Sequence, residues 1–505
     1  MLQGFFGEAG IAGNSIKHQP KFSVLAPTQQ KITMQMPQGI VSVVIASDIS
    51  PKNDIKAFGI GYLSNREVIV RTLAALQYTY SETATDFDLL HQLYFLIGRD
   101  AFRLAEGHFC CVLIYDTEVV LATGKTPGPK LYYYQGEHGQ LLFASEIGAF
   151  PSEYLALVPH DSNFEQHAHC DPTFTPFVHV RSVCPGELVL QTLNPLSAPQ
   201  RISYYSPLRT IQYSAGDEHT ASEHLRTILQ DAVNAIPGKH AICLVSGGLD
   251  SSIIGYLAKQ HFESVRYLSI GTAQRNEFEP ARLFVESIQG NYQQIEFSEQ
   301  DFLVNLAEVI ALVEHSYSTY LEYLVPVHIA HKHLPQDADV ILSGYGSDIL
   351  FAGFAKPHNS THDIASLIRT EYQSTYWANE ASQTLGFAHG LHVAYPYFDS
   401  RVVDLAFSFS PHLCHIKKIE KFILRQAFSN DIDERVVWRK KVGVHEGTGC
   451  EDFFSAYLTS SSEQINSLEL RQRKDVFCHR ILEEIMILGI TPQNINFNKI
   501  RSSIL

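Results

Sequence analysis

The stretch Ser-Gly-Gly-Leu-Asp-Ser-Ser at residues 246–252 decides the fold of the larger part of this chain. It follows an apolar, strand-like run at 240–245 and opens a helical pattern at 251–260. The two glycines let backbone amides approach a phosphate, the serines add hydroxyl donors, and a helix N-terminus favours an anion. The stretch lacks the Gly-Lys-Ser/Thr ending of a Walker A loop. It therefore suits release of pyrophosphate from a nucleotide rather than transfer of a γ-phosphoryl group.

A second strand-turn element repeats this pattern. The run 339–342 leads into Ser-Gly-Tyr-Gly-Ser-Asp at 343–348, so Asp348 opens a short helical segment as Asp250 does. A magnesium ion that bridges phosphates usually has one or two protein carboxylates, and Asp250 and Asp348 are predicted to supply them. The strand end at 269–272 has the position expected for adenosine contacts. The residues predicted to contact ATP are Val245, Ser246, Gly247, Gly248, Asp250, Ser251, Ser252, Ile270 and Gly344.

The surrounding sequence alternates helices with single apolar strands. A helical pattern at 223–234 precedes the first strand, and a further strand is expected at 266–270. This alternation is typical of an α/β doubly wound parallel sheet, in which ligands bind at the carboxyl ends of the strands. After Cys450 the pattern is mostly helical.

The first part of the chain has a different pattern. Short β-branched or aromatic runs are separated by turn residues, and one long amphipathic helix is expected at 89–104, which predicts an α+β sandwich. A polar, proline-containing stretch at 194–207 has the composition of a linker. A chain of 505 residues is long enough for two cores, and we expect domains at 1–205 and 215–505. The expected strands are 39–45, 108–115, 130–134, 140–144 and 186–191.

Composition excludes some classes of partner. With 53 acidic and 38 basic residues the formal charge is -15, which argues against nucleic acid or an anionic membrane. The eight cysteines form no C-x-x-C pair and are interpreted as reduced core thiols. Residues 1–17 do not have the pattern of a signal peptide, and no stretch approaches ~20 uncharged apolar residues. We expect a cytoplasmic protein.

Several motifs together resemble one known family. Besides the loop at 246–252 and the turn at 343–348, these are Ser-Ile-Gly-Thr at 269–272, Asn-Glu-Phe-Glu at 276–279 and Trp-Arg-Lys-Lys-Val-Gly-Val-His-Glu-Gly at 438–447. They resemble the carbapenam and β-lactam synthetases, which are themselves similar to class B asparagine synthetases. The resemblance covers nearly all of the second domain and implies an ATP pyrophosphatase-type synthetase.

The first domain resembles the glutaminase half of an asparagine synthetase. The motifs are Pro-Lys-Leu-Tyr-Tyr at 129–133, Phe-Ala-Ser-Glu-Ile at 143–147 and Pro-Gly-Glu at 185–187. A glutamine-hydrolysing amidotransferase begins Met-Cys-Gly, whereas this chain begins Met1-Leu2-Gln3. Without that thiolate, glutamine is not hydrolysed by this chemistry. We therefore expect an N-terminal-nucleophile glutaminase-like domain that is inactive, as the resemblance to the β-lactam synthetases also implies.

If no ammonia is made, the nitrogen nucleophile arrives with the substrate and needs a base. The resemblance implies a tyrosine partnered by a glutamate, and the matching residues are Tyr345 and Glu380. It also implies a lysine that stabilises the oxyanion and the departing phosphate. Lys441 matches that position best, and Lys440 is the competing candidate.

The predicted reaction has two half-steps that need ATP and Mg²⁺. A β-amino acid carboxylate attacks the α-phosphate, and the amine of the same molecule then closes a β-lactam ring on the acyl-adenylate, in antibiotic or toxin biosynthesis. Three alternatives stay open: an ammonia-dependent asparagine-synthetase-like ligase, a macrolactam cyclase of the lasso-peptide type, and a catalytically silent binding protein. The identity of the β-amino acid and a homo-oligomeric state are also open. The family's substrate pocket is expected at Tyr317, Tyr320, Glu322 and Tyr323.

Overall fold

The computed structural model describes most of the chain, and its residues divide into two compact units, Met1–Ser206 and Pro207–Leu505. The division falls inside the polar stretch 194–207. Each unit is described by itself. The described residues are 2–10, 28–36, 39–47, 56–136, 140–159, 171–193, 197–209, 217–356, 358–378, 382–440, 442–459 and 465–505.

The first unit contains two antiparallel sheets. The sheets pack face to face, since Phe5 and Phe58 from different sheets have ring centroids 5.1 Å apart. The first sheet has the order β2 (Thr28–Met36), β3 (Gly39–Ser47), β1 (Leu2–Gly10), β8 (Leu141–Ala144), β7 (Tyr132–Gln135), β9 (Val180–Ser182). The second has the order β11 (Gln200–Ser203), β10 (Glu187–Thr192), β6 (Glu118–Thr123), β5 (Gly107–Ile114), β4 (Ala57–Leu63).

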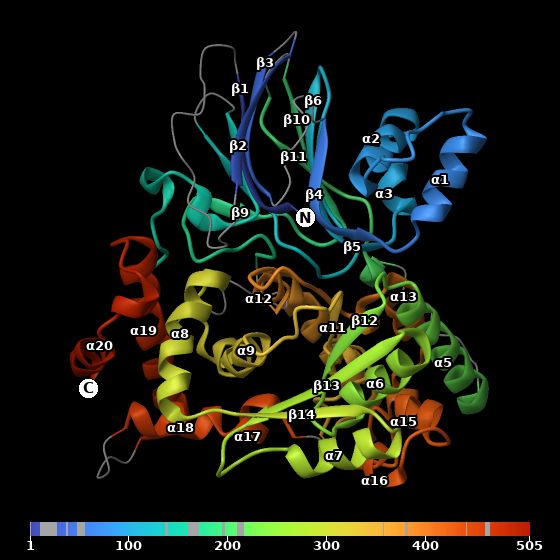
Figure 1. Ribbon diagram of the computed structural model, residues 1–505, viewed down its shortest axis with the longest axis vertical. Helices are drawn as coiled ribbons and strands as arrows, with labels where there is room; N and C mark the ends of the chain where they lie inside the picture. The colour runs from blue at the N-terminus through green and yellow to red at the C-terminus, as the bar shows by residue number, and fades with distance from the viewer. Residues whose placement is uncertain are drawn as a thin grey trace. The chain divides into compact units, whose positions relative to one another are not determined.

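Helices cover the outer face of the second sheet (Figure 1). They are α1 (Arg66–Ala75), α2 (Asp86–Ile97) and α3 (Asp100–Leu104). The single long helix expected at 89–104 is wrong in this respect, because Gly98 takes a left-handed φ of 62° and separates α2 from α3. The sheets and flanking helices are those that the short strand runs predict.

The second unit contains the predicted parallel sheet. All its neighbouring strands pair in parallel. From β12 the chain proceeds outward to β13 and β14, then returns to place β15 on the other side of β12. This is a topological switch point, where ligands bind at the carboxyl ends of the strands. The order is β14 (Asn291–Glu296), β13 (Ser264–Gly271), β12 (His240–Leu244), β15 (Val340–Leu342), β16 (His392–Ala394).

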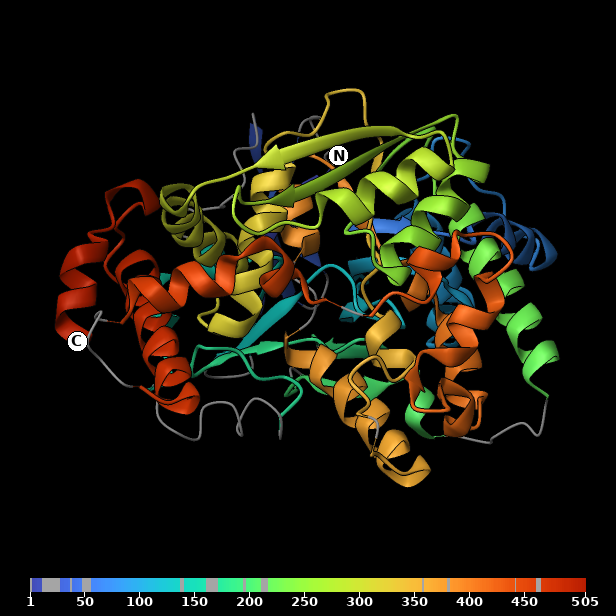
Figure 2. The same ribbon diagram turned by 90° about the horizontal axis from the view of Figure 1, so that it is seen from below.

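Helices pack around this sheet and continue into a helical C-terminal part. In both views α19 and α20 lie at the opposite end of the unit from α5 (Figure 1, Figure 2). The helices are α5 (Glu218–Asn234), α6 (Leu249–His261), α7 (Phe278–Ser287), α8 (Glu299–Val313), α9 (Ser318–His331), α10 (Ser347–Leu350), α11 (Thr361–Ala378), α12 (Ser382–Phe387), α13 (Ser400–Ser408), α14 (Pro411–Cys414), α15 (Phe422–Phe428), α16 (Glu434–Val437), α17 (Val444–Thr448), α18 (Cys450–Tyr457), α19 (Ser467–Met486) and α20 (Phe497–Ile504), with a hairpin of β17 (His415–Ile416) and β18 (Ile419–Glu420).

Two expectations from composition can be compared with these units. Seven cysteines lie in the described residues, and all are buried thiols without a disulfide, while Cys170 lies outside the described residues. Across the ranges that the structure describes, no helix is both long enough and apolar enough to span a bilayer.

Candidate active site

The loop at 246–252 is fixed by its own backbone and hydroxyl groups. Gly247 has a left-handed φ of +66°, and a Cβ there would lie 2.3 Å from the carbonyl carbon of Pro280, so only glycine fits. The amide of Ser246 donates to Ser251 Oγ at 3.2 Å, and the amide of Gly248 donates to Ser246 Oγ at 3.3 Å. Val245 is buried just before the loop, and its amide donates to the Leu268 carbonyl at 2.8 Å.

Helix α6 begins directly after this loop. Its N-cap is Gly248, which offers no side-chain cap, so amides of the first turn are left for another acceptor. Ser252 Oγ is buried and makes no hydrogen bond within the described residues. A helix N-terminus with free amides, adjacent hydroxyls and a glycine-rich approach has the chemistry that binds phosphate. These residues fit the triphosphate of ATP.

The two strand-end turns touch each other through their backbones. A Cβ on Gly344 would lie 2.8 Å from the amide nitrogen of Ser251 and 2.9 Å from the carbonyl carbon of Asp250. Gly346, two residues later, has a φ of +102° and opens α10. The close approach needs glycine at 344, and it brings the first turn of α10 beside the first turn of α6.

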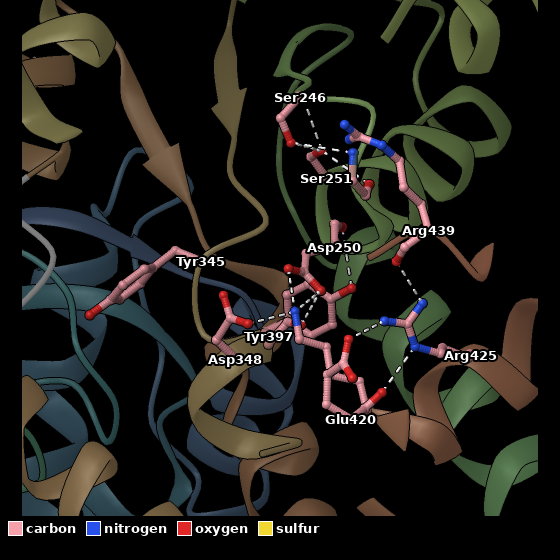
Figure 3. Close-up of polar contacts among 12 residues, drawn as sticks. Ser246, Asp250, Ser251, Tyr345, Asp348, Tyr397, Glu420, Arg425 and Arg439 are labelled. Atoms are coloured by element: carbon pink, nitrogen blue, oxygen red, sulfur yellow. Dashed lines mark hydrogen bonds and ion pairs between the residues drawn. The ribbon is translucent and has the colours of Figure 1, made fainter. Parts of the chain in front are cut away.

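Asp250 and Asp348 therefore lie close to one another (Figure 3). One lysine, Lys421, binds both carboxylates. Lys421 Nζ lies 2.7 and 2.6 Å from the two carboxylate oxygens of Asp250, and 2.6 Å from Asp348 Oδ1. Ser347 Oγ also donates to Asp250 Oδ1. Two carboxylates that the sequence separates by almost a hundred residues thus share one cation.

The electrostatics of this group follow from burial and charge. The Lys421 side chain is 2% exposed, whereas those of Asp250 and Asp348 are 21% and 24% exposed. Burial lowers the pKa of Lys421, but the two carboxylates outweigh it, so the pKa lies above its ordinary value and the ammonium stays charged. The hydroxyl of buried Tyr397 donates to the Asp250 carbonyl at 3.3 Å, and burial raises its pKa far above the ordinary value. Tyr397 is therefore a neutral donor.

The donor set at Asp250 and Asp348 fits a magnesium ion. Mg²⁺ prefers oxygen ligands and is usually held by one or two carboxylates together with substrate phosphates. Here two carboxylates already converge on a single positive charge beside a phosphate-binding helix N-terminus. In the described part of the chain, no cluster of three or more His, Cys, Asp or Glu ligands occurs, so the protein would offer the ion two carboxylates at this site.

A buried arginine connects the Lys421 segment to residues 437–439. Arg425 Nη2 donates to Glu420 Oε1 at 2.8 Å, and Arg425 Nη1 donates to the carbonyls of Val437 and, at 3.1 Å, Arg439. Arg425 is 3% exposed, so these bonds are shielded from water. The Arg439 side chain in turn pairs with Glu277. The chain that leads to Lys440 is thereby fixed by α15, the helix that begins directly after Lys421.

The structure describes only some of the predicted catalytic residues. Tyr345 lies in the turn between β15 and α10, with its ring 5.9 Å from that of Tyr395 and 5.4 Å from that of Phe398. In Figure 3 its hydroxyl points away from Asp250 and Asp348. Glu380 and Lys441 lie outside the described residues. Ile270 lies on β13, paired with Ile295 of β14.

The residues expected to form a substrate pocket lie at the start of α9. Glu322 is buried and its carboxylate lies 2.5 Å from Lys474 Nζ on α19. Tyr317 is also buried, and its hydroxyl accepts from Arg471. The rings of Tyr317 and Tyr320 are 5.0 Å apart, and those of Tyr320 and Tyr323 are 5.5 Å apart. Glu322 is thus engaged by a lysine of the same unit.

Sequence reasoning missed Lys421, Ser347, Tyr397 and Arg425. Lys421 belongs to a basic hairpin, residues 417–421, that lies about 170 positions after Asp250, and no local motif marks it. Lys417, Lys418 and Lys421 adopt a left-handed backbone conformation, which the structure shows but the sequence does not. The sequence instead predicts the catalytic lysine in the basic run at 439–441.

Comparison with known proteins identifies the family. The asparagine synthase family model matches residues 224–387 and 370–488. The chain is 27% identical to the carboxyethyl-arginine β-lactam synthase of Streptomyces clavuligerus, over 74% of this chain and 71% of that protein. It is 28% identical to the human glutamine-hydrolysing asparagine synthetase over 54% of each chain, about half the length of that relative.

Solved structures are similar at low TM-scores. A glutamine phosphoribosylpyrophosphate amidotransferase from B. subtilis has a TM-score of 0.27 at 11% identity, covering 58% of this chain and 65% of that one. An NMN synthetase from Francisella tularensis also has a TM-score of 0.27, at 12% identity, covering 54% of this chain and 96% of that one.

The family model spans more than half of the chain and includes the loop at 246–252, the turn at 343–348 and the Lys421 hairpin. The protein therefore belongs to the asparagine synthase family and is an ATP-dependent ligase that forms carbon–nitrogen bonds.

Proposed function

We propose that this ligase adenylates the carboxylate of a β-amino acid and that the amine of the same molecule then closes a β-lactam ring. The observation that carries the proposal is the convergence of Asp250 and Asp348 on one cation beside the phosphate-binding start of α6. Such an arrangement suits an attack on the α-phosphate with pyrophosphate as the leaving group. A β-lactam product would belong to antibiotic or toxin biosynthesis.

In the first half-reaction the substrate carboxylate attacks the α-phosphate of ATP. The amides and hydroxyls of residues 246–252 bind the phosphates, with Ile270 and Gly344 bordering the nucleotide. Asp250 and Asp348 would hold Mg²⁺, which neutralises phosphate charge when bound. The products of this step are acyl-adenylate and pyrophosphate.

In the second half-reaction the substrate amine attacks the acyl carbon and AMP leaves. Tyr345, partnered by Glu380, takes the amine proton, and Lys441 stabilises the oxyanion of the tetrahedral intermediate. The ring packing of Tyr345 against Tyr395 and Phe398 supports a fixed orientation for this base. Because amine and carbonyl belong to one molecule, ring closure is a well-oriented unimolecular step.

The proposal that the amine comes from the substrate is supported by the thiols of the first unit. Its described cysteines, Cys110, Cys111 and Cys184, are buried, and burial raises the pKa of each, that of Cys110 to about 12. Strand β1 (Leu2–Gly10) contains no cysteine. A thiolate nucleophile is therefore not available among these residues. We propose that domain 1–205 is structural and that domain 215–505 carries the chemistry.

The similarity to the β-lactam synthase combines wide coverage with higher identity. It spans 74% of this chain at 27% identity, against 54% at 28% for the human asparagine synthetase and 83% at 22% for the probable asparagine synthetase of Dictyostelium discoideum. The named substrate of that synthase, carboxyethyl-arginine, is a β-amino acid, so it is a reasonable first compound to test. An ammonia-dependent asparagine-synthetase-like ligase is the second candidate, because asparagine synthetases are also among the relatives.

The test is incubation of the purified protein with ATP, Mg²⁺ and a panel of β-amino acids that includes carboxyethyl-arginine. The expected products are AMP, pyrophosphate and a compound lighter than its substrate by one water, identified by mass spectrometry. Aspartate with ammonium in place of the panel separates the second candidate, since asparagine would then appear. Formation of asparagine with no cyclised product would refute ring closure. Release of glutamate from glutamine above a buffer control would refute a structural first domain.

A further inference from the structure

Lys421 lies where a divalent cation would be expected. Its ammonium is within 2.7 Å of oxygens from both Asp250 and Asp348, and its side chain is only 2% exposed. The three charges sum to one negative charge, whereas the two carboxylates alone would carry two. Lys421 therefore neutralises half of the charge that would attract a free divalent ion.

The position of Lys421 is built into the fold. Its backbone adopts a left-handed φ of 54°, and the preceding Glu420 is held by Arg425. A Cβ on Gly353 would lie 1.9 Å from Asp348 Oδ1 and 2.5 Å from Lys421 Cε, so a glycine is needed for this packing. Four elements, α6, α10, the turn after it and the β18–α15 junction, converge on one ion group. A surface lysine that drifts onto an acidic pair would not have these constraints.

Free and nucleotide-bound metal ions differ in what they bring to this site. A free divalent ion would compete with the Lys421 ammonium for the same carboxylate oxygens. It would also place two positive charges next to the positive charge of that ammonium. A metal–triphosphate complex brings negative oxygens that can accept from Lys421 Nζ while the metal takes the carboxylates. The ammonium and the metal then share the anionic partners instead of competing for them.

We propose that Lys421 is a resident counter-ion that closes the Asp250–Asp348 site to free divalent cations, so that the metal enters only together with the nucleotide. The inference rests on the proposed function, since it takes the two carboxylates as the metal ligands. It adds an order of binding and a role for Lys421. The chemical class of the ligand is a divalent cation bound to a nucleoside triphosphate.

The experiment measures Mn²⁺ binding to the full chain by electron paramagnetic resonance, which needs no turnover. Without nucleotide, the wild-type protein is expected to bind Mn²⁺ weakly, and Lys421→Gln to bind it at least about tenfold more tightly, because a unit positive charge is removed beside the ion. Lys421→Gln retains a hydrogen-bond donor and an extended side chain. Lys421→Met is a second variant that removes the donor as well.

Two controls locate the effect. Lys474→Gln removes another buried lysine of the second unit, whose ammonium lies 2.5 Å from the carboxylate of Glu322, and it should gain no Mn²⁺ binding. Adding Asp348→Asn to Lys421→Gln should abolish the gain, because the second carboxylate is lost. With the non-cleavable analogue α,β-methylene-ATP, the wild-type protein should bind Mn²⁺ readily.

Several results would overturn the inference. The inference is overturned if the wild-type protein binds Mn²⁺ as tightly without the nucleotide analogue as with it. This result counts even if neither Lys421 variant folds. Equal Mn²⁺ affinity of folded Lys421→Gln and wild type would do the same. The test is separate from that of the proposed function. A gain in metal binding with no cyclised product would refute ring closure alone, and cyclisation with no gain would refute only the counter-ion role.

Discussion

Two buried lysines of the second unit differ in a way that separates chemistry from structure. Lys474 faces one carboxylate, Glu322, at 2.5 Å, and the two side chains are 7% and 8% exposed. Lys421 faces two carboxylates at 2.6–2.7 Å and is more deeply buried than either of them. The first contact joins one cation to one carboxylate, while the second joins one cation to two carboxylates that are themselves 21% and 24% exposed.

A buried one-to-one ion pair is costly to break, because removing one partner leaves the other charge in a poorly solvated place. A group with unbalanced charge at strand ends retains its attraction for a cation or for a ligand that carries one. Both lysines are held by the fold, so burial alone does not identify an active site. An active site is identified better by the number of carboxylates that share a cation and by their position beside a helix N-terminus.

The largest expected effect comes from removing a carboxylate of the unbalanced group. Asp250→Asn and Asp348→Asn should each reduce ATP–pyrophosphate exchange by at least about 10³-fold, because a metal ion contributes several kcal/mol to stabilising charge on the phosphates. The exchange is measured with labelled pyrophosphate and a substrate that the wild-type protein cyclises. Glu483→Gln, which removes a charge from the exposed pair with Arg480 on α19, should keep its exchange. Undiminished exchange in either aspartate variant would contradict the two-carboxylate site.

The sequence was sufficient for the parts of this comparison that are local. The run 240–252 predicts β12, the loop and the start of α6, and the turn at 343–348 predicts that Asp348 opens a helix. Lys421 could not be predicted, because it reaches Asp250 only through the tertiary packing of a hairpin about 170 residues away. The helix expected at 89–104 was drawn too long because a single glycine, Gly98, did not outweigh the apolar pattern on both sides of it.

The next effect separates the two half-reactions. Tyr345→Phe and Glu380→Gln should leave pyrophosphate exchange intact while ring closure slows by about 10²–10⁴-fold, the usual contribution of a general base. Single-turnover measurement of acyl-adenylate and cyclised product resolves the two steps. If Tyr345→Phe loses exchange as fully as closure, this tyrosine belongs with the carboxylate group and not with a separate base.

Lys441→Ala provides the contrast for this base. It should slow closure by a loss of roughly 2.7–4 kcal/mol, as for a single oxyanion donor. Higher pH should partly restore Glu380→Gln, since more of the substrate amine is then neutral, but it should not restore Lys441→Ala. An identical pH response of both variants would mean that their roles are not distinct.

Breaking the contact between Lys474 and Glu322 should lower stability. Lys474→Met removes the buried ammonium that lies 2.5 Å from the Glu322 carboxylate, and the free energy of unfolding should fall by about 3–5 kcal/mol. Urea titration followed by circular dichroism measures this loss. The matched control is Arg480→Ala, which breaks the exposed pair with Glu483 and should cost less than about 1 kcal/mol. A loss of similar size in both variants would mean that the Glu322–Lys474 pair is no more than a surface contact.

The smallest expected effect concerns a buried group that carries no charge at all. His331 lies on α9, where burial and the neighbouring His389 and His328 lower its pKa from the usual 6.5 to about 3. Two charged groups also face this histidine cluster: Glu308 contacts His328, and Lys332 pairs with Glu308. Between pH 6.5 and about pH 3, His331 is protonated in the unfolded chain but neutral in the folded protein.

Acidification should therefore destabilise the wild-type protein through His331. Above pH 6.5 this residue makes stability independent of pH, and below it the free energy of unfolding should fall by up to about 1.4 kcal/mol per pH unit. His331→Leu removes that term, so urea titrations at pH 7 and pH 5 should show a smaller loss in the variant than in the wild type. The loss of unfolding free energy between pH 7 and pH 5 is compared between the wild type and the variant. The difference reports His331 alone, because the other histidines and any change in packing that acts equally at both pH values cancel. Equal losses would mean that His331 is protonated in the folded protein, and the cluster would then carry a buried charge, as Lys421 and Lys474 do.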